Sequence, residues 1–206
     1  EGRLVFQKQV QQPLPKVAED PPESFPPVQD SITVEVSKSD FQHGQFWNWF
    51  WGRHYRAEYN TTLKLPALRL SEYQGGVRPV KRGGGYQTNS LRLEGKDGRQ
   101  YAMRSIDKDA SRTLGYPFNE SFVTAVLEDN FSAAHPFASI ATAALAKEAG
   151  IYYTQPGMFY LPRQPELGIY NEDYAGAVYT VEERPDDEVW NDYEQFGAPK
   201  RIRSTL

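Results

Sequence analysis

The segment best suited to bind an anion lies near the middle of the chain, where cations precede a glycine turn. It consists of two basic residues and three consecutive glycines: Lys81, Arg82, Gly83, Gly84 and Gly85. Glycines let backbone amides approach an anion closely, and nearby cations add Coulomb attraction. No acidic residue occurs between Glu72 and Glu94. These features predict a phosphate-binding turn; the alternative is a flexible hairpin tip with ordinary surface charges.

A further cation follows on a strand behind this turn. The stretch Tyr101-Ala-Met-Arg104 has the shape of the kinase strand that offers a lysine to phosphates beneath a glycine loop. Arg104 is always charged and can hold a phosphate with two parallel hydrogen bonds. Because kinases use lysine at this place, the arginine argues against catalysis. In the alternative interpretation, Arg104 pairs with a carboxylate of the following helix, Glu120 or Glu128.

A dense aromatic cluster, Phe46-Trp-Asn-Trp-Phe-Trp51, is the second feature with an evident use. Its hydrophobic period is unclear. One interpretation places it at a membrane interface, where Trp rings lie at the level of the headgroups. The other is a wedge packed into this domain or a neighbouring one, which is favoured because a polar edge follows at residues 53–56. We therefore predict an interface that uses Trp47, Trp49 and Trp51.

The composition excludes several functional classes. The chain has 206 residues and no cysteine, so a disulfide framework, a Cys-based zinc site and a thiol nucleophile are excluded. Its three histidines lie far apart, which argues against a histidine-rich metal site. The net charge of −4 argues against a basic nucleic-acid-binding domain. The longest apolar run, residues 138–146, is about half the length of a membrane-spanning helix.

The elements that must position these residues form an α+β pattern. Strands are expected at residues 32–36, 90–94, 100–106, 157–161 and 175–182, and helices at residues 120–131 and 137–149. Residues 63–70, which contain Pro66, are expected to form an edge strand or an extended connection. Asp97 and Gly98 suit a tight turn that joins two of these strands as a hairpin. Leu91 and Leu93 fall on one face of the first hairpin strand and Arg92 on the other. The order predicts an antiparallel sheet with a helix pair on one side.

The distribution of proline suggests three parts. Six of the fifteen prolines lie in residues 1–30, which are therefore predicted to form an extended arm or linker. Residues 31–185 are the predicted α+β domain, and residues 186–206 an acidic loop and a connection to a following element. Because the chain begins with Glu1 rather than Met, we expect a processed chain or a fragment of a larger protein.

Several longer motifs stand out along the chain. They are residues 50–56 (FWGRHYR), 79–93 (PVKRGGGYQTNSLRL), 103–108 (MRSIDK), 133–137 (AAHPF) and 182–185 (EERP). Together they resemble the middle region of large Bacteroidota envelope proteins, which lies between a calcineurin-like metallophosphatase domain and an outer-membrane barrel related to the barrel-assembly protein. The resemblance covers roughly residues 40–203. It implies a periplasmic or surface-exposed, outer-membrane-associated location in the cell envelope, but supplies no reaction.

The order of glycine loop, basic strand, helix and further strands also resembles the N-terminal lobe of a kinase. Residues 145–151 (LAKEAGI) are similar to the helix end in HipA-like and spore-coat-type atypical kinases. Phosphoryl transfer additionally needs an Asp and a metal-holding Asn or Asp from a second lobe. We find no such segment here, so catalysis by this chain alone is not expected, and no catalytic or metal-ligating residue is predicted.

Two functions follow from these observations. The first is a non-catalytic structural or interaction module of an envelope protein, whose partners are other domains or chains of an envelope complex and not nucleic acid. The second is the phosphate- or nucleotide-binding lobe of a split or truncated atypical kinase, with ATP and Mg²⁺ as the ligand. In that lobe the glycines and Arg104 would contact the phosphates, with Lys81 and Arg82 as outer cations. Capture of an anionic ligand or lipid headgroup by the basic hairpin is a third, weaker possibility.

Overall fold

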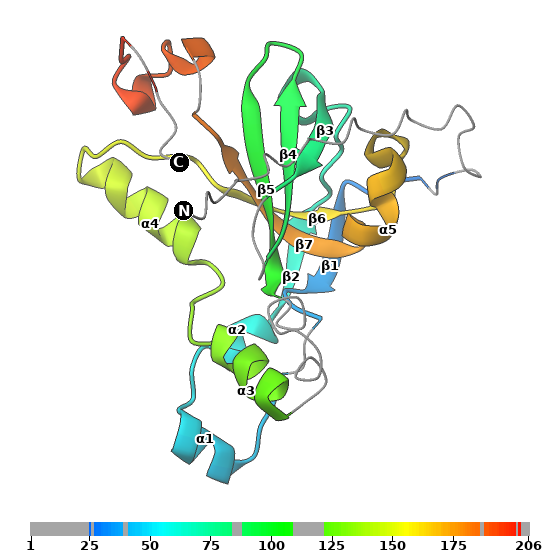
Figure 1. The fold of residues 1–206 in the computed structure, drawn as a ribbon, viewed down its shortest axis with the longest axis vertical. Helices are drawn as coiled ribbons and strands as arrows, with labels where there is room; N and C mark the ends of the chain where they lie inside the picture. Colours follow the sequence, from blue (N-terminus) through cyan, green and yellow to red (C-terminus); the bar gives the residue numbers. More distant parts are fainter. Residues whose placement is uncertain are drawn as a thin grey trace, which may run out of the picture.

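The computed structural model describes residues 25, 27–38, 41–83, 88–108, 122–185, 188–200 and 202. These residues form helices and two antiparallel sheets, which confirms the predicted α+β class (Figure 1). The strands are β1 (Ser31–Glu35), β2 (Thr62–Pro66), β3 (Val77–Arg82), β4 (Thr88–Gly95), β5 (Gln100–Lys108), β6 (Gly157–Leu161) and β7 (Ala177–Glu183). The helices are α1 (Gln45–Trp51), α2 (Arg56–Tyr59), α3 (Phe122–Phe131), α4 (Ala138–Glu148) and α5 (Asn171–Tyr174). Short 3₁₀ segments lie at Tyr73–Gly75, Pro165–Tyr170, Glu188–Trp190 and Glu194–Phe196.

The larger sheet has five strands in the order β3-β4-β5-β7-β6. All neighbouring pairs are antiparallel. The predicted hairpin of β4 and β5 forms its centre, with Leu91 paired to Met103 and Glu94 paired to Gln100. Gly98 in the turn between them has a φ of +82°, a conformation that glycine adopts without steric cost. Because β3 and β4 are neighbours, the glycine-rich segment connects two adjacent strands.

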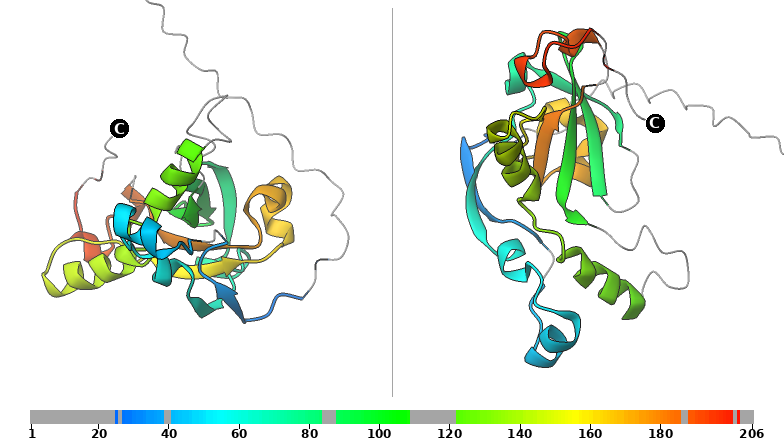
Figure 2. Two further views of the ribbon diagram at one scale, coloured as in Figure 1. Left: turned by 90° about the horizontal axis from the view of Figure 1, so that it is seen from below. Right: turned by 90° about the vertical axis from the view of Figure 1, so that its left-hand side faces the viewer.

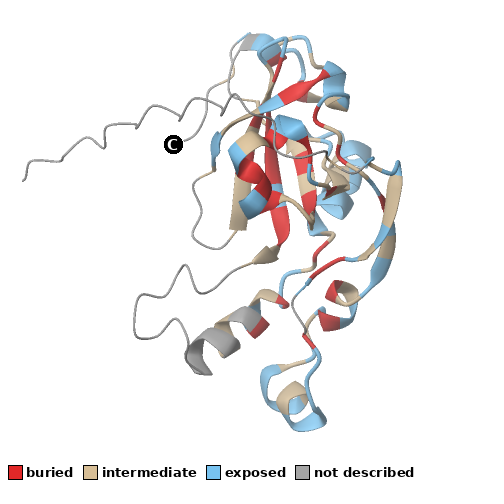
Figure 3. Ribbon diagram, turned by 90° about the vertical axis from the view of Figure 1, so that its right-hand side faces the viewer, coloured by how far each residue is buried: buried red, intermediate tan, exposed pale blue. Residues whose placement is uncertain are grey.

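One face of the larger sheet forms the main core. The side chains of Leu91 and Leu93 are buried on this face, whereas Arg92 points to the other, as the alternation in the sequence predicts. Residues from outside the sheet complete this cluster: Leu68, Leu70, Leu167, Tyr170, Tyr174, Trp190 and Phe196. Figure 3 shows the buried residues, in red, concentrated along the strands of this sheet.

The smaller sheet, β1 paired with β2, covers part of the opposite face of the larger sheet. Its Leu65 packs with Ile106 of β5 and Val178 of β7 in a second buried cluster. The amide of Leu68 donates a hydrogen bond of 2.8 Å to the carbonyl oxygen of Tyr160 in β6, which ties the end of the small sheet to the large one. The right-hand view of Figure 2 shows the small sheet lying beside the large one. The part of that face that carries Arg92 lies outside the apolar cluster.

Both predicted helices between β5 and β6 are confirmed as α3 and α4. Gly150 follows α4 with a φ of +68°, so it is the C-terminal stop that the sequence indicates. No residue of α4 is buried, and the helix lies beside the large sheet (Figures 1 and 2). α3 lies near α1 and α2, beyond the end of the sheet.

Several elements were not anticipated from the sequence, among them the strand β3 and the short helices α1, α2 and α5. Residues 77–82 form the edge strand β3, although Pro79 lies within it. Proline is tolerated here because the strand is at an edge and its pairing register shifts between Pro79 and Lys81. The aromatic cluster, whose period is unclear in the sequence, is the helix α1.

The segment after β7 contributes directly to the main core. Trp190 and Phe196 are buried and their rings contact each other edge to face, with centroids 5.9 Å apart. The guanidinium of Arg99, in the β4–β5 turn, lies over the rings of Trp190 and Tyr193, at 5.5 and 4.6 Å from their centroids. Residues 188–196 are thus packed against the hairpin, although the sequence predicts an acidic connection here. Among the described helices, none is both long and apolar enough to cross a membrane.

Candidate anion-binding site

A cavity of about 220 Å³ lies on the polar part of the large sheet, next to the glycine-rich segment. Its lining combines three arginines, two hydroxyl groups and two small residues: Gly83, Thr88, Ser90, Arg92, Ala102, Arg104 and Arg184. We call this the anion cavity. It is the place where the sequence-predicted Gly83 and Arg104 meet.

Strand register explains why the arginines converge. Arg92 of β4 pairs with Ala102 of β5, and Ser90 pairs with Arg104, so all four side chains lie on the same face. Arg184 follows β7, the strand on the other side of β5. Its amide donates a hydrogen bond of 2.9 Å to the carbonyl of Gln100, and its Nη1 donates one of 3.0 Å to the Gln100 side chain. Three neighbouring strands therefore deliver three guanidinium groups to one cavity.

Positive charges repel each other within the anion cavity. Burial and the positive charge of Arg184 both lower the pKa of Arg104. Arg104 forms an ion pair with Glu182 of β7, whose other oxygen accepts a hydrogen bond of 3.0 Å from Thr154. A bound anion beside Arg104 and Arg184 would relieve the repulsion between their two positive charges.

The partner of Arg104 differs from the one suggested by the sequence. The structure pairs it with Glu182, a neighbour across the β5–β7 ladder. The suggested Glu120 and the side chain of Glu128 lie outside the described part of the chain. Pairing within the sheet holds the arginine along the strand face and leaves 49% of its side chain exposed.

Gly83 occupies a position where a side chain does not fit. Its amide donates a hydrogen bond of 2.7 Å to the carbonyl of Ser90. A Cβ atom built on Gly83 would lie 2.3 Å from Oγ and 2.6 Å from Cβ of Ser90, which is closer than such atoms ever approach. The glycine therefore allows β3 to come close to β4 at the end of the anion cavity.

The remaining predicted phosphate ligands separate into three groups. Lys81 pairs in register with Arg92, so it lies on the same face as the anion cavity. Arg82 pairs with Leu91 and lies on the opposite face, where its guanidinium forms an ion pair with Asp173 and lies 5.8 Å from the ring centre of Tyr174. The prediction of a phosphate contact by Arg82 is thus not supported by its position. Gly84 and Gly85 lie outside the described residues.

Thr88, Ser90, Arg92 and Arg184 complete the lining, and none of them is among the predicted phosphate ligands. Arg92 was recognisable as the polar residue between Leu91 and Leu93, which places it on the face away from the core. Arg184 has no such signal, because only the long-range pairing of β5 with β7 brings it to the cavity.

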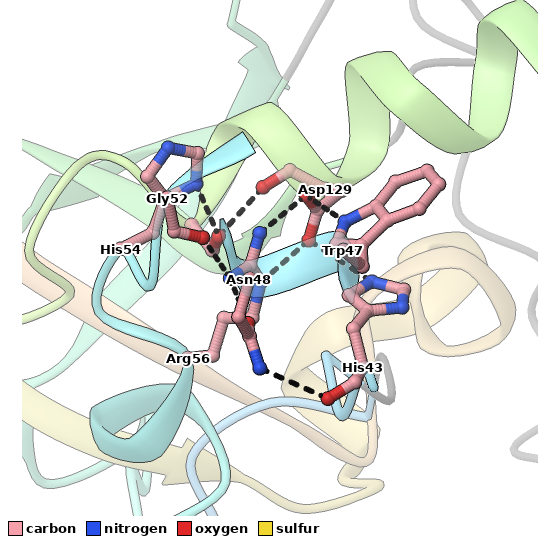
Figure 4. A network of polar contacts seen from close by, with 8 residues as sticks. His43, Trp47, Asn48, Gly52, His54, Arg56 and Asp129 are labelled. Atoms are coloured by element: carbon pink, nitrogen blue, oxygen red, sulfur yellow. Dashed lines mark hydrogen bonds and ion pairs between the residues drawn. The ribbon is translucent and has the colours of Figure 1, made fainter. Parts of the chain in front are cut away.

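A second polar site joins α1, α2 and α3 and is shown in Figure 4. Asp129 of α3 accepts hydrogen bonds from Nε and Nη2 of Arg56, at 2.7 and 2.6 Å, and from the indole Nε1 of Trp47, at 2.9 Å. His43 Nε2 lies 3.0 Å from the same carboxylate. Arg56 in turn donates a hydrogen bond of 2.7 Å to the side chain of Asn48. We call these five residues the helix anchor.

The helix anchor is arranged for structural support. Burial raises the pKa of the Asp129 carboxyl, but hydrogen bonds from Arg56 and Trp47 and the charges of Arg56 and His43 outweigh it and hold that pKa below its usual value. The side chains of Arg56 and Asp129 are 7% and 5% exposed, so the ion pair is shielded from water. The carboxylate has its partners inside the protein and is poorly placed to act on a ligand.

The three tryptophans predicted to form an interface have different environments. Trp47 points inward to Asp129, whereas Trp49 and Trp51 are 78% and 40% exposed. Phe46 and Phe50 belong with the exposed pair, at 76% and 61%. One side of α1 thus anchors the helix and the other leaves aromatic rings uncovered.

Comparisons with protein-family models, with curated proteins and with solved structures found no match for this chain. Among the described residues, no group of three or more His, Asp and Glu side chains is placed to hold a metal ion.

Proposed function

We propose that this chain binds a phosphate-bearing ligand in the anion cavity, without catalysing its transfer. The observation that carries the proposal is the convergence of Arg92, Arg104 and Arg184 beside Gly83 in a single cavity. Guanidinium groups match phosphate oxygens in charge and geometry, and the hydroxyls of Thr88 and Ser90 add donors.

The size of the anion cavity favours a small anionic group. Its volume of about 220 Å³ is below the range of roughly 300–1,000 Å³ typical of sites that enclose a whole drug-sized ligand. One or two phosphate groups fit such a volume. We therefore propose a diphosphate group, free or at the end of a nucleotide, whose remaining parts extend out of the cavity.

The arrangement of the parts supports the proposed kinase-like origin. The glycine-rich segment connects the first two strands of the large sheet, and Arg104 lies on the third strand, where kinases carry their phosphate-binding lysine. The proposal stops at binding because that lysine is replaced and because Glu182, the carboxylate beside Arg104, is engaged by Arg104 and Thr154. An envelope location remains part of the proposal and rests on the motif resemblance alone.

Calorimetric titration with inorganic pyrophosphate, and with ATP in the presence and absence of Mg²⁺, tests this function. We expect saturable binding that weakens as salt is added, because exposed charges are screened over about 8 Å at physiological ionic strength. Ligand at a hundred times its dissociation constant should stabilise the fold by about 2.7 kcal/mol. Arg184→Gln should weaken binding at least tenfold, since a hydrogen bond to a charged group contributes about 1.5–3 kcal/mol.

Arg82→Gln is the matched control. It removes one arginine from the neighbouring strand, but on the face away from the anion cavity. Binding that is lost equally in both variants would reveal a general charge effect. Absence of any heat or thermal shift with millimolar pyrophosphate and ATP would refute the proposal.

Attachment to a surface of the cell envelope is a second candidate function. The observation that favours it is the uncovered aromatic surface of α1, which the anion cavity does not use.

A further inference from the structure

The exposed side of α1 is an apolar surface that projects from the described part of the fold. We call the four side chains Phe46, Trp49, Phe50 and Trp51 the aromatic tip. Figure 1 shows α1 at one end of the molecule's long axis, and Figure 3 shows the same helix without any buried residue. Single exposed apolar residues are common on protein surfaces, but four adjacent aromatic rings on one short helix are not.

Hydrogen bonds on the inner side of α1 hold the aromatic tip in position. Trp47 and Asn48 lie between Phe46 and Trp49 along the helix, and both form hydrogen bonds within the helix anchor (Figure 4). Arg56 also donates to the carbonyl of Gly52, at the end of α1. These contacts fix the position of a short helix that has no buried residue of its own, so its exposed rings point outward from a defined backbone.

The area of the tip is small for a stable protein–protein interface. With about 150–250 Å² per aromatic side chain and the exposed fractions given above, the tip offers on the order of 500 Å². A stable protein complex buries about 800 Å² on each partner. A projecting tip of this size suits a deformable surface better than a second folded protein.

The charges around the tip point to the same kind of partner. No acidic residue occurs in residues 41–57, while Arg53 is exposed directly after α1. The carboxylate of Asp129, which also lies beside α1, is paired with Arg56 inside the helix anchor. The exposed Trp and Phe rings together with the exposed Arg53 therefore match the interfacial region of a membrane that contains anionic lipids.

We propose that the aromatic tip inserts into the headgroup region of an anionic lipid bilayer and brings the domain to the membrane surface. The proposal is independent of phosphate binding, because the aromatic tip and the anion cavity share no residue. Trp49, Phe50 and their neighbours would lie at the boundary between headgroups and acyl chains, with Arg53 among the lipid phosphates.

The test is binding of the full chain to vesicles of phosphatidylcholine alone or mixed in equal amounts with phosphatidylglycerol. Co-sedimentation and tryptophan quenching by brominated lipids report binding and depth. We expect binding to the mixed vesicles and quenching of the exposed tryptophans, while buried Trp190 remains unquenched. Trp49→Ala and Phe50→Ala should each reduce the partition coefficient at least fivefold, and Arg53→Glu should reduce it on the mixed vesicles only.

Leu145→Ala is the matched control, because Leu145 is 72% exposed on α4, away from the tip. It should bind vesicles like the wild type, and the far-ultraviolet circular dichroism of all variants should be unchanged. Failure of the wild-type chain to bind mixed vesicles overturns the proposal. So does equal binding by Trp49→Ala, or a concentration-dependent dimer that Trp49→Ala abolishes, which would assign the tip to a second copy of the chain.

Discussion

Gly83 is the residue of the anion cavity whose backbone position leaves no room for a side chain. It stands where β3 approaches β4 so closely that a methyl group would collide with Ser90. Three glycines in a row are a weak sequence signal, because flexible tips also contain them. The structure adds a steric requirement at Gly83 and places Gly83 and Arg104 in the lining of one cavity.

The variant Gly83→Ala should therefore destabilise the protein and weaken pyrophosphate binding. Overpacking a close contact costs roughly 1–3 kcal/mol, because the strands must move apart. Urea unfolding and calorimetry measure the two effects. Gly44→Ala is the control, since a Cβ at Gly44 meets nothing within 4 Å. Equal stability of the two variants would show that the close approach of β3 and β4 is not required.

At the scale of elements, local sequence signals were sufficient to predict the strands and helices whose hydrophobic residues recur at a regular spacing. The β4–β5 hairpin and helices α3 and α4 follow from alternation, from the turn at Asp97 and Gly98, and from helical spacing. The strand β3 was missed because Pro79 argues against a strand until its edge position is known. The helical nature of α1 was missed because aromatic residues on all its sides leave no amphipathic period.

The residues that line the anion cavity could likewise be predicted only where a local motif marks them. Gly83 and Arg104 could be predicted because each lies in a local motif. Arg184 could not, because its place depends on β7 returning beside β5 after the two intervening helices and β6. Arg82 was misplaced because adjacent residues of a strand point to opposite faces, and the strand itself had not been recognised.

The helix anchor joins α1, α2 and α3, so a substitution within it should loosen all three helices. Asp129→Asn should leave Arg56 buried without a charged partner and cost roughly 3–5 kcal/mol, since breaking a buried ion pair leaves an uncompensated charge. Chemical denaturation measures the loss. A change below about 1 kcal/mol would show that α1, α2 and α3 are held together by other contacts.

Acid should act on the same carboxylate. Its pKa is lower in the folded than in the unfolded protein, so its contribution to stability is complete above the unfolded pKa of about 3.9. That contribution is lost as the pH falls through the folded pKa. Asp129→Asn should thus show a flatter decline of stability below about pH 4 than the wild type. Parallel declines would contradict the role of Asp129.

At the scale of the whole molecule, the segment after β7 closes the fold. Trp190 is buried against Tyr101 of the hairpin, with ring centroids 5.6 Å apart, and Arg99 lies over its ring. The main core is thereby built from residues that span the chain from Leu68 to Phe196. The arginines of the anion cavity and the residues of the helix anchor lie outside this core, so they can be substituted without emptying it.

Trp190→Ala should accordingly cost roughly 3–5 kcal/mol, the usual loss when a buried Trp is truncated. Trp190→Phe should retain most of the stability, because a ring remains against Tyr101. Thermal unfolding followed by circular dichroism measures both. A single shifted transition is expected, whereas an unchanged melting temperature for Trp190→Ala would show that residues 188–196 are not part of the core.

A nuclear magnetic resonance titration of the full chain with inorganic pyrophosphate shows whether phosphate binds in the anion cavity. We expect saturable chemical-shift changes that are concentrated at the backbone amides of five residues: Gly83, Thr88, Ser90, Arg104 and Arg184. Arg184→Gln should suppress them and Arg82→Gln should not. Shifts that stay linear with concentration, or that cluster on the opposite face around Arg82 and Asp173, would contradict binding in the anion cavity.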